Sequence, residues 1–182
     1  TVQSPAASRF DATPAGPTVR QRPWEPINAP VRSAPALRSR ARRDEVLKQF
    51  GVASNPRYAT SPSAVFAWDV TRAMGAELPA YEHGRAVDLR AKLETSGGAE
   101  GWRQVSEIEA QAWANRGSPS LIVGRATRGP DGTAVPGLVG VVRPGQLSAR
   151  GPAVAVGGAR ACPAIPASDV FDRQLSTYWV HD

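Results

Sequence analysis

The sequence predicts an α+β protein in which helices pack on a central antiparallel sheet. After residue 43, helix patterns fill the first part of the chain and strand patterns fill the rest. Helices followed by a run of neighbouring strands are typical of this class, whereas regular alternation of the two would indicate a parallel sheet. The 182 residues are enough for one domain and a terminal segment.

Four segments have the pattern of helices. One is expected over residues 44–50, which open with acidic residues, and one over residues 63–75, where apolar residues recur at i, i+4 and i+7. The spacing of Leu89 and Leu93 indicates a short third helix. The motif Ser-Glu-Ile-Glu at residues 106–109 is a capping box, in which the first serine and the last glutamate each bind a free backbone N–H. It predicts the start of a fourth helix.

The second part of the chain has the composition of strands. Strands are expected at residues 120–123, 138–142, 152–156 and 177–180, which are rich in valine, isoleucine and aromatic residues. Turns are expected at residues 55–58 and 130–133, where Asn-Pro and Pro-Asp-Gly occur.

The basic charge of the chain lies in its first 43 residues. Eight arginines and two acids give residues 1–43 a net charge of +6, which equals that of the whole chain. The same segment holds seven of the 17 prolines. It is expected to be a disordered leader or linker, because it has little apolar surface to bury. Its densest basic stretch, residues 38–43, could contact an anionic surface or nucleic acid. Residues 44–182 would then form the single domain.

The composition excludes several classes of site. A single cysteine excludes an internal disulfide and a cysteine-based structural zinc site. Two histidines without a neighbouring cluster make a catalytic metal unexpected, and no phosphate loop or dinucleotide fingerprint is present. No apolar run is long enough to cross a membrane. We therefore expect neither a metal nor a cofactor.

The residues by themselves leave two interpretations of the nucleophilic groups. Cys162 is the only thiol, and His83 and His181 are the only imidazoles. A cysteine nucleophile needs a base, and no histidine is close to Cys162 in sequence, so a structural role for all three residues is the simpler interpretation. The alternative is an active hydrolase in which Cys162 or Ser63 is the nucleophile, with His83, His181 or another group as its base.

Several motifs resemble a bacterial group within the papain-like CHAP superfamily, the cysteine- and histidine-dependent amidohydrolases and peptidases. The resemblance spans about residues 44–182 and keeps the order and spacing of the family's motifs. The matching stretches are Asn55-Pro-Arg-Tyr58, Phe66-Ala-Trp-Asp-Val-Thr-Arg-Ala-Met-Gly-Ala-Glu77, Gly101-Trp-Arg-Gln-Val-Ser106, Glu109-Ala-Gln-Ala-Trp-Ala-Asn-Arg-Gly117, Pro136-Gly-Leu-Val-Gly-Val-Val-Arg-Pro-Gly145, Gly151-Pro-Ala-Val-Ala and Tyr178-Trp-Val-His181.

The catalytic residues of this family are replaced in the chain. Family members carry Cys-Asn at the start of the first core helix, where this chain has Ser63 and Ala64. The general-base histidine of a Pro-Gly-His motif is replaced by Leu138. A glutamine and an asparagine that commonly follow are replaced by Val156 and Ala161. A laboratory substitution would explain Ser63, but it would not explain the other changes, so the resemblance implies a naturally degenerate site.

The resemblance therefore implies a papain-like pseudoenzyme. Leu138 cannot accept a proton, and the Ser63 hydroxyl needs a base to become a nucleophile. We expect a protein that binds a peptide, a glycan-peptide or a protein partner in a vestigial cleft formed by Ser63, Leu138 and Val156. The cell-wall association of the family and the leader suggest a secreted or translocated bacterial effector, or an envelope protein. The alternatives are the active hydrolase above and an adaptor that binds anions or nucleic acid through its basic tail.

Overall fold

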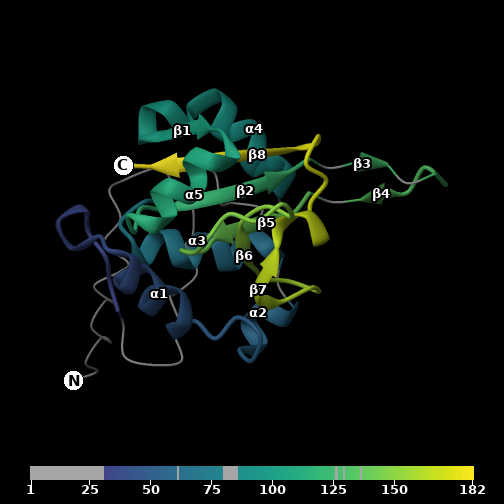
Figure 1. Ribbon diagram of the computed structural model, residues 1–182. Coiled ribbons are helices and arrows are strands. Elements are labelled where there is room, and N and C mark those ends of the chain that lie inside the picture. The colour runs from purple at the N-terminus through teal and green to yellow at the C-terminus, as the bar shows by residue number, and fades with distance from the viewer. Residues whose placement is uncertain (1–30, 61, 80–85, 126, 129, 136) are drawn as a thin grey trace, which may run out of the picture.

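The computed structural model describes most of the chain after residue 30. The described residues are 31–60, 62–79, 86–125, 127–128, 130–135 and 137–182. Over these residues the protein is α+β, with helices on both faces of a six-stranded sheet (Figure 1). The strand order is β1-β8-β2-β5-β6-β7, and every neighbouring pair is antiparallel. The predicted class and the antiparallel sheet are confirmed.

All four predicted strands are present and occupy the centre of the sheet. The strands are β1 (Trp102–Val105), β2 (Ser120–Gly124), β5 (Val139–Val142), β6 (Ala153–Val156), β7 (Cys162–Pro166) and β8 (Ser176–His181). The predicted ones are β2, β5, β6 and β8. A separate two-stranded hairpin, β3 (Thr127–Arg128) and β4 (Ala134–Val135), flanks the turn that was predicted at residues 130–133.

The helices follow the predicted pattern with two differences. They are α1 (Arg40–Gln49), α2 (Pro56–Thr60), α3 (Ser63–Ala73), α4 (Ala86–Ser96) and α5 (Glu107–Asn115). The expectation of a turn at residues 55–58 is wrong from Pro56 onward, because α2 begins at that residue and the Asn55 side chain accepts a hydrogen bond from the Arg57 N–H in its first turn. Helix α1 begins earlier than expected, since the Ser39 hydroxyl caps it. The boundary that we expected at residue 43 therefore falls inside a helix.

The sheet separates two apolar clusters. Phe66, Val139 and Trp179 belong to the larger cluster, on the face that carries α1, α3 and α4. Ile122 and Val156 belong to the smaller cluster, on the face that carries α5. Consecutive residues of a strand point to opposite faces, so each central strand supplies side chains to both clusters.

Arg43 joins α1 to the two central strands from a fully buried position. Its guanidinium donates hydrogen bonds to the Val142 carbonyl at 2.6 and 3.2 Å and to the Ser120 carbonyl at 3.2 Å. Burial lowers the pKa of Arg43 to about 9, which leaves the group charged at neutral pH. The carbonyls at one end of β2 and β5 are satisfied in this way.

Candidate functional site

Ser63 opens α3 and holds this helix to the start of β5. Its Oγ accepts a hydrogen bond of 3.0 Å from the backbone N–H of Val139. The serine side chain is nearly inaccessible, with 5% of the residue exposed. The contact joins segments that are 76 residues apart in sequence. Because every residue of α3 is buried, the position of Ser63 against β5 is fixed by packing along the whole helix.

The contact lies where strands β5 and β6 separate. Their pairing ends with Gly140 opposite Val156, and the N–H of Val139, the next residue of β5, donates to Ser63. Gly157 follows β6 at this point, where a Cβ atom would lie 2.6 Å from a side-chain atom of α3. A glycine therefore lets the end of β6 pass close to the first turn of α3.

Leu138 and Val156 lie beside this contact. Leu138 immediately precedes the residue that Ser63 binds, and Val156 lies on the adjacent strand opposite Gly140. Leu138 and Val156 are thus diagonal neighbours on one face of the sheet. Both pack against the cluster on the α5 side, where Val156 is fully buried and Leu138 is half-buried. Leu138 and Val156 therefore flank the backbone that Ser63 binds, but their hydrocarbon side chains pack on the α5 side of the sheet, whereas Ser63 belongs to α3 on the other side.

The other two positions that the resemblance predicts are Ala64 and Ala161. Ala64 is the second residue of α3 and is buried in the larger cluster. Ala161 lies in the turn after β6, where its N–H donates to the Gly158 carbonyl at 2.9 Å and its methyl group packs against the same cluster. Neither side chain offers a donor or an acceptor to Ser63.

His181 stands far from the Ser63 hydroxyl. It lies at the end of β8, where its Nε2 is 2.8 Å from the Glu100 carbonyl oxygen and its ring packs edge-on against Trp102. Strand β8 is two strands away from β5, and His181 is four residues beyond the level of Val139. Two inter-strand spacings and the rise of four residues put the backbone of His181 roughly 16 Å from that of Val139, the residue that Ser63 contacts. His83, the other predicted base, lies outside the described residues.

Cys162 and His181 do not form a catalytic pair. Cys162 begins the edge strand β7 and donates a weak hydrogen bond of 3.4 Å from Sγ to the Ala164 carbonyl. Four inter-strand spacings separate β7 from β8, a distance of roughly 19 Å. The thiol and this imidazole are therefore separated by most of the width of the sheet.

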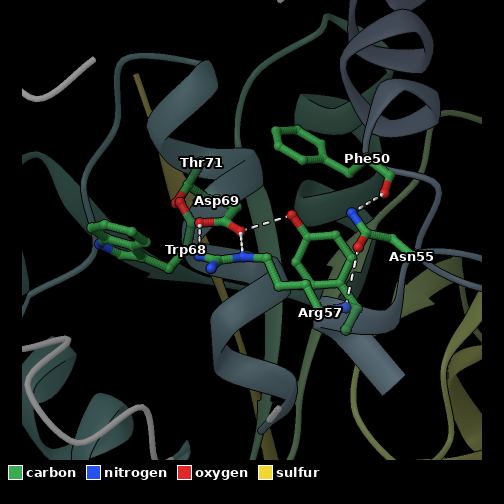
Figure 2. A network of polar contacts seen from close by, with 7 residues as sticks. Phe50, Asn55, Arg57, Trp68, Asp69 and Thr71 are labelled. Atoms are coloured by element: carbon green, nitrogen blue, oxygen red, sulfur yellow. Dashed lines mark hydrogen bonds and ion pairs between the residues drawn. The ribbon is translucent and has the colours of Figure 1, made fainter. Parts of the chain in front are cut away.

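A buried polar network, which the sequence patterns did not reveal, supports the first turns of α3 (Figure 2). The Asp69 carboxylate is completely buried and accepts hydrogen bonds from Arg57 Nε at 2.8 Å, from Arg57 Nη2 at 3.2 Å and from the Tyr58 hydroxyl at 2.7 Å. Burial raises the pKa of Asp69, and the hydrogen bonds from Arg57 and Tyr58 oppose this effect. Burial, together with the neighbouring Asp69 carboxylate, raises the pKa of Tyr58.

The network gives a structural reason for the two motifs at residues 55–58 and 68–69, because their side chains contact each other. The Tyr58 carbonyl also accepts a hydrogen bond of 2.6 Å from the Gly158 N–H, in the loop after β6. Helix α2 is thereby tied both to α3, through Asp69, and to the loop that follows Val156. These residues position the site, and the only sequence signal for them was their place in the matching motifs.

Comparison with known proteins finds no matching family model, no similar curated protein and no similar solved structure. Within the described ranges, no group of three or more histidine, cysteine, aspartate or glutamate residues could hold a metal ion. No helix in that part of the chain is long and apolar enough to span a bilayer. Function is therefore inferred from contacts within the chain itself.

Proposed function

We propose that this protein is a catalytically inactive relative of the papain-like CHAP amidases and peptidases, and that it acts by binding. The hydrogen bond between the Ser63 hydroxyl and the Val139 N–H carries the proposal. In an active relative, the start of this helix would supply the nucleophile, and the residue before Val139 would supply the base. In this chain the two segments are in contact, and they carry a serine and a leucine at these positions.

The chemistry at this contact does not support amide hydrolysis. A serine hydroxyl attacks a carbonyl only when a base removes its proton, and the hydrocarbon side chain of Leu138 has no site for that proton. Val156 cannot orient an imidazole either. The hydroxyl of Ser63 is almost completely shielded from solvent. Removing a single member of a catalytic triad already lowers the rate by several powers of ten.

The proposed ligand is a peptide, a glycan-peptide or a protein partner. Leu138 and Ala161 are half-exposed hydrocarbon side chains, Leu138 toward the α5 side of the sheet and Ala161 toward the α3 side, so a ligand at either position would meet an apolar side chain. The resemblance to cell-wall enzymes suggests stem peptides of peptidoglycan as the ligands to examine first. We accordingly propose a role as a secreted or translocated bacterial effector, or at the bacterial envelope.

The pairing of positions 63 and 138 can be tested with a thiol. In a Cys162→Ser background, Ser63→Cys places the only thiol of the protein at the start of α3. Adding Leu138→His should lower the pKa of that thiol by two or more units from its usual value of about 8.5, as in enzymes that pair cysteine with histidine. The matched control is the same thiol with Leu138 retained. Alkylation rates measured against pH report both values. Equal thiol pKa values in the two variants would show that the positions do not form a pair, and the proposed relationship would then be wrong.

A second experiment separates binding from catalysis. The unmodified protein is incubated with peptidoglycan stem peptides, and both cleavage and nuclear magnetic resonance shifts are followed. We expect no cleavage, with shifts centred on residues 138 and 161. Cleavage that Ser63→Ala abolishes would instead establish an active serine hydrolase. Cleavage lost only on Cys162→Ser would establish the cysteine alternative.

A further inference from the structure

An exposed apolar turn projects from one end of the molecule. Residues 34–37, Ala-Pro-Ala-Leu, are all exposed, and Leu37 is 55% exposed. They form the short helical turn η1 (Pro35–Leu37), which the Leu37 N–H closes onto the Ala34 carbonyl at 2.8 Å. Figure 1 shows this dark segment extending from the body next to α1. We call residues 34–37 the apolar turn.

The base of the apolar turn is anchored to two helices. The backbone N–H and carbonyl of Val31 each make a hydrogen bond of 2.6 Å to the Gln49 side chain, at the end of α1. The N–H of the buried Ser33 donates to the Ala73 carbonyl at 3.0 Å, at the end of α3. These bonds fix the entry to the turn, so its apolar side chains are held outward from the body.

Two arginines follow the apolar turn, and the guanidiniums of two more lie over the end of α5, which packs against Ser39. Arg38 and Arg40 follow the turn directly along the chain. A Cβ atom at Gly117 would overlap the backbone of Ser39, so the end of α5 lies against the same segment. The guanidiniums of Arg116 and Arg103 both lie over the Trp113 ring of α5, at 5.4 and 4.7 Å from its centroid. We call Arg38, Arg40, Arg103 and Arg116 the basic rim.

The carboxylate of Asp182 acts on the basic rim, because it attracts both Arg38 and Arg103. Among the described residues, Arg38, Arg40 and Arg116 have no carboxylate within ion-pair distance. Arg103 has one, Asp182, at 3.7 Å and largely in solvent. The N-terminus of α1, which carries the positive end of the helix dipole, lies between Arg38 and Arg40. An anionic partner would therefore relieve repulsion at this end of the protein.

We propose that the apolar turn and the basic rim bind the surface of an anionic lipid bilayer. The turn would enter the boundary between headgroups and acyl chains, and the arginines would contact headgroup phosphates. A nucleic acid fits this surface less well, because its phosphate backbone offers no apolar contact to the exposed Pro-Ala-Leu turn. It would also use free aromatic faces for base stacking, whereas two guanidiniums occupy Trp113. This surface is independent of the Ser63 site.

Vesicle sedimentation with the full chain tests the proposal. Vesicles of phosphatidylcholine alone are compared with vesicles that contain phosphatidylserine as well. We expect binding to the anionic vesicles only, and we expect added salt to weaken it, because exposed charges are screened within a Debye length of about 10 Å at 0.1 M salt. Absence of binding, or equal binding to both kinds of vesicle, would overturn the proposal.

Substitutions can distinguish binding through this surface from binding through the overall positive charge of the protein. Arg40→Gln and Arg116→Gln should each weaken binding roughly fivefold, and Leu37→Ser roughly tenfold. Two matched controls make the same changes elsewhere: Ile108→Ser removes a side chain on α5 that is 70% exposed, and Arg125→Gln removes an exposed charge after β2.

Both controls should bind as the unmodified protein does, with circular dichroism melting curves that show all variants folded. Equal losses in the controls would refute a localised surface. Retained vesicle binding in Leu37→Ser, combined with displacement by single-stranded DNA, would assign the basic rim to nucleic acid and overturn the lipid proposal.

Discussion

The hydrogen bond from Tyr58 to Asp69 should be among the strongest single side-chain contacts near the site. Tyr58→Phe removes only the hydroxyl and keeps the ring, which packs edge-on against Phe66 at 5.1 Å and Phe50 at 6.3 Å. The Asp69 carboxylate then keeps its bonds to Arg57 but loses the 2.7 Å bond. A hydrogen bond to a buried charged group contributes about 1.5–3 kcal/mol, so the free energy of unfolding should fall by about 2 kcal/mol.

Urea unfolding followed by circular dichroism measures this loss as a lower midpoint with an unchanged slope. The matched control is Tyr178→Phe, whose hydroxyl donates to Glu107 at 2.9 Å. The Glu107 side chain is 23% exposed, so water can replace the lost hydroxyl, and the cost should stay below about 1 kcal/mol. Equal losses for the two variants would refute the argument that burial of Asp69 strengthens its hydrogen bond.

The effect of Tyr58→Phe should also depend on pH. The hydroxyl favours the ionised form of Asp69, so the substitution raises the pKa of that carboxyl further. The stability that the hydroxyl contributes is therefore complete above the folded-state pKa of Asp69 and shrinks as pH falls through that pKa. The difference between the two unfolding free energies, measured from neutral pH downwards, should narrow. A constant difference would show that Asp69 is not the group involved.

Three further predictions concern packing, capping and alkaline stability. Gly157→Ala should lower the unfolding free energy by roughly 1–3 kcal/mol, because the new methyl group would overlap α3. The control Gly98→Ala has open space around it and should lower the unfolding free energy far less. Equal melting curves for the two variants would contradict this prediction. Ser106→Ala should lower the unfolding free energy by about 1 kcal/mol in urea titrations, because it removes the cap of α5. Burial raises the pKa of Tyr58 and Tyr178, so both should stay protonated in the folded state above pH of about 10, and stability should fall as pH rises beyond it. Difference absorbance that reports complete tyrosine ionisation before unfolding would rule this out.

The central elements could be predicted because their signals are local. Strands β2, β5, β6 and β8 are runs of β-branched and aromatic residues, and such residues favour the extended backbone wherever they are buried. The capping box of α5 is complete, with Ser106 and Glu109 bonded to each other's backbone N–H groups. Both kinds of signal depend on residues a few positions apart, so they can be recognised without the fold.

The two edge strands lack such signals. Strand β1 contains the exposed polar residues Arg103 and Gln104 in succession, and β7 contains Pro163 and Pro166, which cannot donate to a ladder. These segments become strands because β8 and β6 present free edges to them. In the same way, Arg43 belongs to a basic stretch that reads as a leader, and its burial depends on the unpaired carbonyls that α1 happens to cover.

Residue types alone restricted the chemistry of this protein, since one thiol, two imidazoles and no phosphate-binding motif allow few kinds of site. The order of the strands in the sheet decides which of these groups come close together, because it brings some distant segments into contact and keeps others apart. Ser63 and Val139 are 76 residues apart and in contact, whereas Cys162 and His181 are only 19 residues apart in sequence and lie on strands that are four spacings apart in the sheet. Local patterns specify helices and strands, and the pairing of distant strands specifies the site.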